Sequence, residues 1–172
     1  MKRAALLATI LGGAAILRAQ CAQAAPSLGS LALATGWLGG HPTLASLRGR
    51  VVLLDVFTFE CVNCTNVTPA LKNLYAAYPR SELEIVAVHT PEVPSYQKAI
   101  GYVARQRQAA ALPWPIALDN EHRIWDAYGV SAWPTQLIFD RAGHLRYTIV
   151  GEGQDRHVAA AVRSLVHGFM VS

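Results

Sequence analysis

A run of β-branched and apolar residues over positions 51–57 is broken only by Asp55. Such a run is typical of a strand that is buried on both faces of a sheet. After it, apolar side chains recur at helical spacing at positions 67, 71, 74 and 78, and Pro79 follows the last of them. The pattern therefore predicts a buried strand followed by a helix that ends before Pro79.

The rest of the chain changes repeatedly between strand and helix patterns. Residues 25–50 are rich in Gly, Ser, Ala and Pro, and they predict a lead-in with at most a short hairpin. Strands are predicted at 84–89, 115–118, 135–140 and 145–150, and helices at 95–110, 121–128 and 154–166. We expect Gln97 on the exposed side of its helix, Asp119 or Asn120 as a helix cap, and Gly143 in a left-handed turn. This order predicts a single α/β domain that ends in a β-hairpin and a helix.

The first 24 residues have the three-part pattern of a secretory signal peptide. Met1-Lys2-Arg3 is a charged start, residues 4–17 form an apolar run, and Ala22-Gln23-Ala24 is a small-x-small cleavage site. We therefore expect residues 1–24 to be removed and residues 25–172 to form one exported, periplasmic domain.

The alternative is an uncleaved membrane anchor. The apolar run ends at residue 17, before Arg18, and is short for a helix that spans a membrane. Lipid attachment at Cys21 is disfavoured, because Arg18 and Gln20 stand where small apolar residues would be needed.

Composition and charge argue against three classes of protein. Apolar residues make up 52% of the chain and charged residues 15%, which is typical of a globular domain rather than a disordered one. The net charge of +4 includes Lys2, Arg3 and Arg18, and without them 12 basic residues face 11 acidic ones. That balance disfavours a nucleic-acid or anionic-lipid binder, so we expect no nucleic-acid partner.

Loss of Cys21 with the signal peptide leaves Cys61 and Cys64, separated by Val62 and Asn63. A C-x-x-C pair between a buried strand and a helix is typical of redox chemistry. Because a helix N-terminus favours a thiolate, Cys61 is the expected attacking sulfur and Cys64 the resolving one. A zinc site wants about four ligands, and the histidines show no such spacing. We therefore expect no metal, and no cofactor beyond the disulfide itself.

Two further positions are candidates for the site. Asp55 lies six residues before Cys61 in an apolar strand, where it could relay a proton to or from Cys64. The alternative is an ion pair between Asp55 and Lys72 or Lys98. A cis bond before Pro134 would expose the Trp133 backbone to an extended substrate, whereas a trans bond would leave an ordinary edge proline.

Together these residues resemble the thioredoxin superfamily, and in particular its exported TlpA/ResA-like branch. Pro69 lies eight residues after Cys61, where these helices kink, and Pro134 falls where the family has a cis-proline. Segments 34–38, 88–92, 146–148 and 151–153 are similar to the thioredoxin-like domain of DipZ proteins.

The resemblance implies a thioredoxin-like fold, with a central mixed β-sheet flanked by helices. It implies Cys61 as nucleophile, Cys64 as resolving thiol and a cis Pro134, with Val62, Asn63, Trp133 and Pro134 contacting the substrate. It also implies protein disulfides as substrates and a membrane thiol carrier as electron donor. DipZ proteins contain that carrier in the same chain, so here we expect a separate donor protein and a monomeric oxidoreductase.

Three residues depart from the family pattern. Glu60 stands where thioredoxins have tryptophan, and its charge would raise the pKa of the neighbouring Cys61 thiol. Val67 stands where many relatives have a functional glutamate, which leaves the proton relay to Asp55 or Glu60. Trp133 is larger than the usual threonine and predicts a narrower substrate groove. Val62-Asn63 matches neither strong reductants nor strong oxidants, so only the resemblance favours a reductase.

Two alternatives remain at this point. Thr58-x-x-Cys61 matches a peroxiredoxin motif, although Leu54 stands where the peroxide site needs proline. The second is a redox-inert binding module that holds a partner protein, or Cu(I) on the two thiolates.

Overall fold

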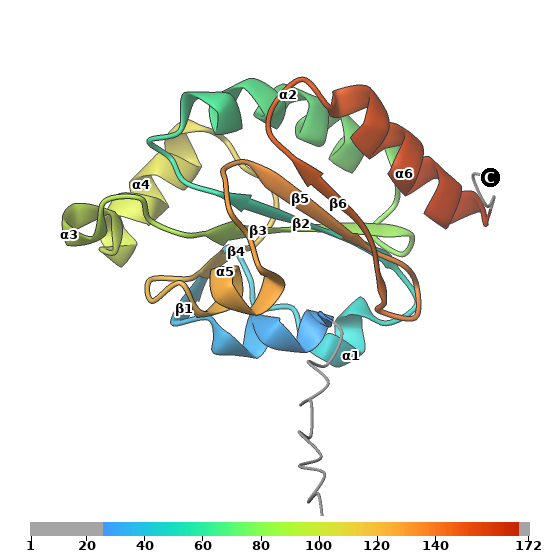
Figure 1. Cartoon of the computed structure of the whole chain (residues 1–172), viewed down its shortest axis with the longest axis horizontal. Helices are drawn as coiled ribbons and strands as arrows, with labels where there is room; N and C mark the ends of the chain where they lie inside the picture. Colours follow the sequence, from blue (N-terminus) through green and yellow to red (C-terminus); the bar gives the residue numbers. More distant parts are fainter. Residues whose placement is uncertain (1–25, 169–172) are drawn as a thin grey trace, which may run out of the picture.

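A mixed sheet of six strands forms the centre of the computed structural model, which describes residues 26–168 (Figure 1). The strands run in the order β1-β4-β3-β2-β5-β6. Their bounds are β1 Gly36–Leu38, β2 Val51–Phe57, β3 Leu83–His89, β4 Ile116–Leu118, β5 Thr135–Phe139 and β6 Leu145–Val150. Strands β2, β3 and β4 are parallel, whereas β1, β5 and β6 each pair antiparallel to their neighbours. The predicted α/β class, with its C-terminal hairpin and helix, is confirmed.

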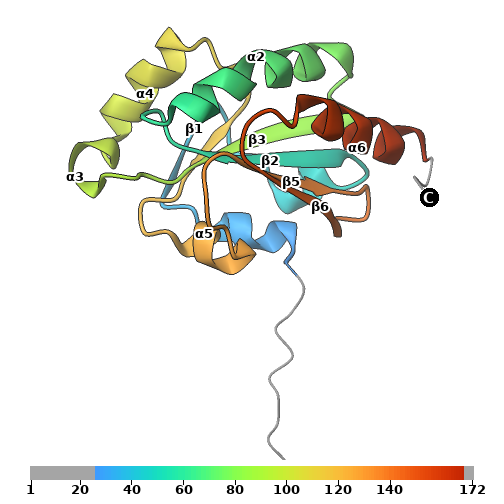
Figure 2. The ribbon, with the colours of Figure 1, turned by 45° about the horizontal axis from the view of Figure 1, so that its top comes forward.

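Helices cover both faces of this sheet (Figure 2). They are the 3-10 helix η1 Leu28–Leu33 and the α-helices α1 Leu44–Leu47, α2 Val62–Ala77, α3 Pro94–Gln97, α4 Ile100–Ala109, α5 Arg123–Tyr128 and α6 Asp155–His167. Helices α2, α4 and α6 pack on one face, and η1, α1 and α5 on the other. None of the helices in the described range is long and apolar enough to cross a bilayer. The predicted signal peptide and Cys21 lie outside the described residues.

Strand β2 supplies both layers of the core because its side chains alternate between the two faces. Val51, Leu53 and Phe57 pack towards α2, whereas Val52 and Leu54 pack towards η1 and α5. All seven residues of β2 are buried, as the apolar run predicts. Asp55 falls on the α2 face of the strand, so the fold places a carboxyl group directly under that helix.

The segment before β2 contains more structure than predicted. The expectation of at most a short hairpin over residues 25–50 is wrong, because this segment forms η1, β1 and α1. Strand β1 pairs antiparallel with β4, and Gly36 lies opposite Leu118 at the edge of the sheet. The three-residue strand is too short to show an alternating pattern, and only the distant β4 makes it a strand.

The predicted helix 95–110 is also wrong as a continuous element. It is divided into α3 and α4, with Ala99 in an extended conformation between them. Gln97 is fully buried and not exposed as expected. Its Oε1 accepts hydrogen bonds from the Val93 backbone N–H at 3.1 Å and from the Thr58 hydroxyl at 3.4 Å. These two donors satisfy the buried side-chain oxygen of Gln97.

The other local expectations are confirmed in part. Helix α5 begins at Arg123 and not at residue 121, after a left-handed His122. The N-cap residue is His122 and not Asp119 or Asn120, although the Asp119 carboxylate, three residues earlier, accepts the backbone N–H groups of Ile124 and Trp125, each at 2.9 Å. Gly143 has a φ of 85° in the turn between β5 and β6.

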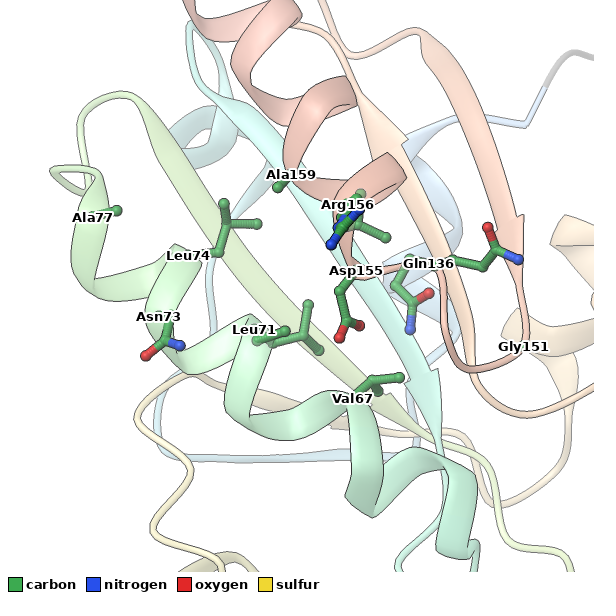
Figure 3. Close-up of a pocket in the computed structure, with 13 residues that line it drawn as sticks. Val67, Leu71, Asn73, Leu74, Ala77, Gln136, Gly151, Asp155, Arg156 and Ala159 are labelled. Atoms are coloured by element: carbon green, nitrogen blue, oxygen red, sulfur yellow. The ribbon is translucent and has the colours of Figure 1, made fainter.

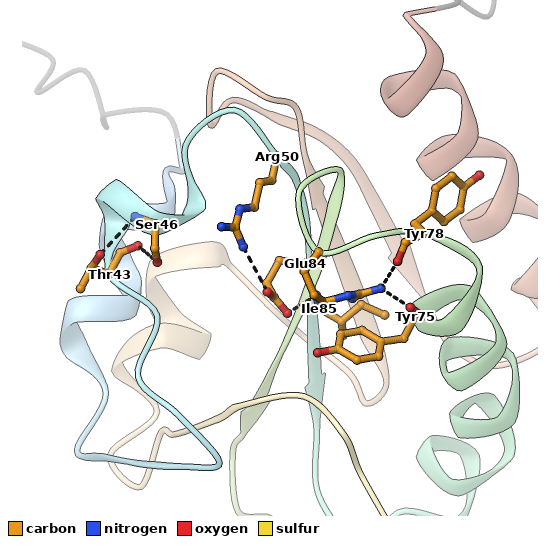
Figure 4. A network of polar contacts seen from close by, with 8 residues as sticks. Thr43, Ser46, Arg50, Tyr75, Tyr78, Glu84 and Ile85 are labelled. Atoms are coloured by element: carbon orange, nitrogen blue, oxygen red, sulfur yellow. Dashed lines mark hydrogen bonds and ion pairs between the residues drawn. The ribbon is translucent and has the colours of Figure 1, made fainter.

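Two arginines, Arg50 and Arg80, connect strands and helix at the C-terminal end of α2, where Figure 4 shows their contacts. Arg50 forms an ion pair with Glu84 at 3.5 Å, which joins the starts of β2 and β3. Arg80 donates to the carbonyls of Tyr75 and Tyr78 at the end of α2, and its guanidinium lies 3.4 Å above the Tyr75 ring. Arg80 therefore satisfies backbone carbonyls at the C-terminus of α2, and the cysteines lie at the other end of this helix.

Candidate active site

Cys61 and Cys64 are joined by a disulfide at the N-terminus of α2, with their Cα atoms 5.3 Å apart. Cys61 is the N-cap residue and is partly exposed, whereas Cys64 is buried one turn further on. The Cys64 backbone N–H points at the Cys61 Sγ, 3.2 Å away. The helix dipole and this N–H both favour negative charge on Cys61, so a reduced Cys61 is the accessible thiolate.

Asp55 lies beneath the cysteines and is 4% exposed. Its Oδ1 accepts a hydrogen bond from the Gln136 Nε2 on β5, at 3.0 Å. The considered ion pair with Lys72 or Lys98 does not form. Lys72 instead donates to the Ala110 carbonyl at 2.6 Å, while the Lys98 carbonyl accepts from Asn120.

Burial raises the pKa of Asp55 to about 6, because a carboxylate loses its hydration there, and the Gln136 hydrogen bond only partly opposes this. A carboxyl group with such a pKa is divided between its two protonation states close to neutral pH. It can therefore both accept and release a proton, which an ordinary exposed aspartate would do only in acid.

A hollow is present on each side of α2. The first, of about 240 Å³, is lined by both Asp55 and Cys64, so the carboxyl group and the buried sulfur face the same space. The second is an apolar groove of about 360 Å³ between α2 and α6, with Gln136 and Val67 in its lining (Figure 3). Asp55 and Gln136 thus form a polar pair that extends from one hollow to the other under the helix.

The Trp133–Pro134 bond is cis, as the resemblance implied. Pro134 is buried and its carbonyl accepts the Gly151 N–H at 2.8 Å. The Trp133 ring lies 4.5 Å from the Trp125 ring of α5, measured between centroids. The large side chain before the proline is therefore partly held against a neighbouring helix.

The residues around Cys61 differ in exposure. Val62 is 70% exposed and Asn63 is partly buried, so Val62 projects from the tip of α2. Glu60 is exposed, and its carboxylate accepts a hydrogen bond from the Tyr102 hydroxyl of α4. Helix α4 therefore holds the acidic side chain that precedes the reactive cysteine.

Sequence reasoning missed two buried polar residues next to this site. Gln136 interrupts the apolar strand β5 as Asp55 interrupts β2, and the two face each other in the sheet register. His89 lies opposite Phe57, and its ring is packed against Phe57 and Phe59. Neither ring nitrogen of His89 has a hydrogen-bond partner among the described residues, and burial lowers its pKa to about 4. The signal for Gln136 is a polar residue inside an apolar strand, and the signal for His89 is a polar residue at the end of one.

This sheet, with a disulfide at the N-terminus of the helix that follows its central strand, defines the thioredoxin-like thiol-disulfide oxidoreductases. The chain belongs to the AhpC/TSA family, which it matches over residues 22–148. Between residues 26 and 168, no group of three or more His, Cys, Asp or Glu is placed to hold a metal ion.

The relatives of this chain include DipZ proteins and a thiol-disulfide oxidoreductase. It is 38% identical to protein DipZ of Mycobacterium tuberculosis over 137 residues, which is 77% of this chain and 20% of DipZ. It thus spans about a fifth of the DipZ proteins that it matches. It is 29% identical to the thiol-disulfide oxidoreductase ResA of Geobacillus kaustophilus over 126 residues, 70% of this chain and 69% of ResA.

Solved structures show the same fold. A thioredoxin-like protein in its oxidised form superposes with a TM-score of 0.71 and 23% identity, over 79% of this chain and 91% of that one. A secreted M. tuberculosis disulfide oxidoreductase homologous to E. coli DsbE gives a TM-score of 0.64 with 21% identity, over 81% and 100% of the two chains. The expected thioredoxin-like fold is therefore confirmed.

Proposed function

We propose that this protein is an exported reductase of protein disulfides. The observation that carries the proposal is the asymmetry of the cysteine pair: Cys61 is reachable from solvent, while Cys64 is buried and shares a hollow with Asp55. An exposed thiolate suits attack on a partner, and a buried thiol next to a carboxyl group suits the later, internal step.

The reaction has two exchange steps. The Cys61 thiolate attacks one sulfur of a partner disulfide, a mixed disulfide forms, and the second partner sulfur leaves as a thiolate. Asp55 then takes the proton of the Cys64 thiol, and the Cys64 thiolate attacks the Cys61 Sγ. The Cys61–Cys64 disulfide forms and the first partner sulfur leaves, so the partner gains two electrons and the reductase loses two.

The partner segment binds in an extended conformation beside the cis-proline. Trp133 and Pro134 precede β5, whose first residue already pairs with β6 on one side and with β2 on the other. An extended segment that reaches Trp133 would add to the backbone at this point, with Val62 and Asn63 contacting it from the tip of α2. The residues named from the sequence thereby acquire one shared role as the substrate surface.

A separate membrane thiol carrier returns the two electrons, and the protein acts as a periplasmic monomer. Export rests on the charged start, the apolar run and the Ala22-Gln23-Ala24 site, which all lie outside the described residues. The mass of the protein purified from its native host tests this proposal. We expect an N-terminus at Ala25, and an intact Met1 in a cytoplasmic fraction would overturn it.

The equilibrium potential of the Cys61–Cys64 pair tests the direction of electron flow. In glutathione buffers we expect a reduction potential of about −270 mV, as for thioredoxin. A potential of about −120 mV is typical of an oxidant such as DsbA. A value near the second figure would contradict the reductase. Turnover of insulin disulfides tests the activity itself.

The Thr58-x-x-Cys61 spacing favours a peroxidase as the second candidate. Against it, the buried Thr58 hydroxyl donates to Gln97, and Leu54 packs in the core on the opposite face of β2 from Asp55. Peroxide consumption with a dithiol reductant separates the two activities. A protein without insulin turnover that binds one Cu(I) tightly would instead be the binding module.

A further inference from the structure

Two carboxylates are fixed on opposite sides of the cysteine pair. Glu60 directly precedes Cys61 and is held by the Tyr102 hydroxyl of α4. Glu152 lies in the turn between β6 and α6, where its Oε2 accepts a hydrogen bond from the Asn66 Nδ2 at 2.7 Å. Since Asn66 is two residues after Cys64, α4 and the β6–α6 turn place one acid on each flank of the α2 tip (Figure 2).

Both donors that hold these acids are neutral. Burial and the neighbouring Glu60 raise the pKa of Tyr102, so its hydroxyl keeps its proton. The ion pairs of the described residues involve Glu84 and Asp140, not Glu60 or Glu152. Among residues 26–168, the two acids beside the cysteines are therefore held by neutral donors and not by an ion pair.

Exposed apolar side chains gather at the same end of the molecule. Within the described range the exposed large apolar residues are Leu44, Val62, Val93, Tyr96, Ile100 and Val150. The Tyr96 ring packs edge-on against Tyr102, which holds Glu60, and Val150 directly precedes the turn that carries Glu152. Leu44 lies on α1 under the opposite face of the sheet (Figure 1). Val150 points to that face as well, because its neighbour Ile149 packs on the α2 side of the core, so the apolar side chains around Glu60 are Val62, Val93, Tyr96 and Ile100.

We propose that the partner presents its reactive cysteine in a segment with basic side chains next to that cysteine and apolar ones beyond them. Glu60 and Glu152 select this segment by charge, and the exposed apolar side chains bind its flanks. The proposal rests on the proposed function and names the substrate class of the same site. It requires no excess of charge over the whole protein, only the local arrangement around Cys61.

The charges also affect the chemistry. The Glu60 carboxylate repels the thiolate of the neighbouring Cys61 and so disfavours attack. A lysine or arginine of the partner that docks beside Glu60 removes that repulsion at the moment when the disulfide arrives. A basic partner therefore associates faster and also meets a more reactive thiolate, whereas an acidic partner gains neither advantage.

Three disulfide-linked peptide dimers test the proposal. They have the same length and apolar flanks, and the residues on both sides of each cysteine are Lys, Gln or Glu. Stopped-flow oxidation of the reduced full-length protein gives a second-order rate constant for each. We expect the Lys peptide to react about tenfold faster than the Gln peptide at low salt, and the advantage to vanish near 1 M salt, where charges are screened within about 3 Å.

A peptide with lysine next to its disulfide can react faster than the Gln peptide even without help from the protein. The double variant Glu60→Gln/Glu152→Gln measures this intrinsic difference, because it lacks both acids. We expect its Lys-to-Gln ratio to be about tenfold lower than that of the wild type. Glu82 directly precedes β3, at the end of this strand that is far from the cysteines. Glu82→Gln is therefore the matched control and should keep the wild-type ratio. Equal ratios in the wild type and the double variant would overturn the charge selection. A reduced protein that reacts with none of the peptides would overturn the proposed function as well.

A matched pair of substitutions tests whether the exposed apolar side chains bind the partner. Ile100 is 55% exposed next to the site and Leu44 is 47% exposed far from it. We expect Ile100→Ser to lower the rate with all three peptides several-fold and Leu44→Ser to leave it unchanged. Equal effects of the two substitutions would contradict the docking surface. A rate constant that falls as the protein concentration rises would show a second copy on this surface and would overturn the proposed occupant.

Discussion

The Nε2 of Gln136 donates a hydrogen bond to the Oδ1 of Asp55 across two neighbouring antiparallel strands, at 3.0 Å. Both side chains are almost fully buried, and each lines a different hollow beside α2. An amide donor stabilises the ionised carboxyl group without supplying a positive charge. Asp55 therefore keeps a raised pKa of about 6 and yet remains oriented, which a lysine partner would not permit.

Cys64→Ser should trap partner proteins as mixed disulfides, and Cys61→Ser should trap none. Once Cys61 is joined to a partner, release needs a second thiolate, and Cys64 is the one other cysteine of residues 25–172. Serine has nearly the same size but is far too poor a nucleophile at neutral pH. Non-reducing gels of periplasmic extracts give the measurement. Adducts of equal amount in both variants would contradict the assigned roles.

Asp55→Asn should slow the resolving step more than the first attack, by about 10²-fold, since asparagine cannot take the proton of Cys64. Stopped-flow reduction of a model disulfide separates the two steps. Equal loss in both steps would show that Asp55 does not act on Cys64.

Gln136→Leu should shift the pH profile of the same step to higher pH. Without the amide donor the pKa of Asp55 rises above its value of about 6, so resolution slows near pH 7 and recovers in more alkaline buffer. A merely structural role of Gln136 would lower the rate equally at every pH. Asp55→Asn is the control, because no alkaline recovery is expected from it.

Stability between pH 4 and 6 should depend little on pH, because two buried groups act in opposite directions. The folded pKa of Asp55 is raised, so its folded form holds a proton that the unfolded chain has released, and stability falls as pH rises from about 4 to about 6. The folded pKa of His89 is lowered to about 4, so the unfolded chain holds the extra proton, and stability rises with pH up to about 6.5.

Two variants should reveal the separate contributions, each at most about 3 kcal/mol over its window. Denaturant unfolding of Asp55→Asn should give a free energy that rises with pH from 4 to 6.5. For His89→Phe the free energy of unfolding should fall over the same range. A slope of the same sign in both variants would contradict the pair of shifted pKa values.

Trp133→Thr should widen the substrate groove. Its ring packs on Trp125, so we expect a loss of about 1–2 kcal/mol in the free energy of unfolding, less than for a fully buried tryptophan. The kcat/KM for peptides with a bulky residue next to the cysteine should rise relative to peptides with alanine there. An unchanged ratio would show that Trp133 does not limit the groove.

The long elements were predictable because each carries its own pattern. The apolar run at 51–57 predicted β2, and the helical spacing after Cys61 predicted α2 up to Pro79. The short elements were not, because β1 has three residues and gains its partner, β4, from about 80 residues away. The burial of Gln97 was likewise not predictable, because its oxygen accepts a hydrogen bond from Thr58, 39 positions away.

The sequence by itself determined the redox chemistry of this protein: two cysteines at C-x-x-C spacing, at the start of a helix that follows a buried strand, with an acid six residues before them. These relations are local, and helix geometry and strand alternation are enough to derive them. The tertiary structure alone decided what surrounds the pair. It placed Gln136, and not a lysine, against Asp55, and it held Glu60 and Glu152 with Tyr102 and Asn66. Partners so distant in sequence are chosen by the packing of strands and helices, which no local pattern encodes.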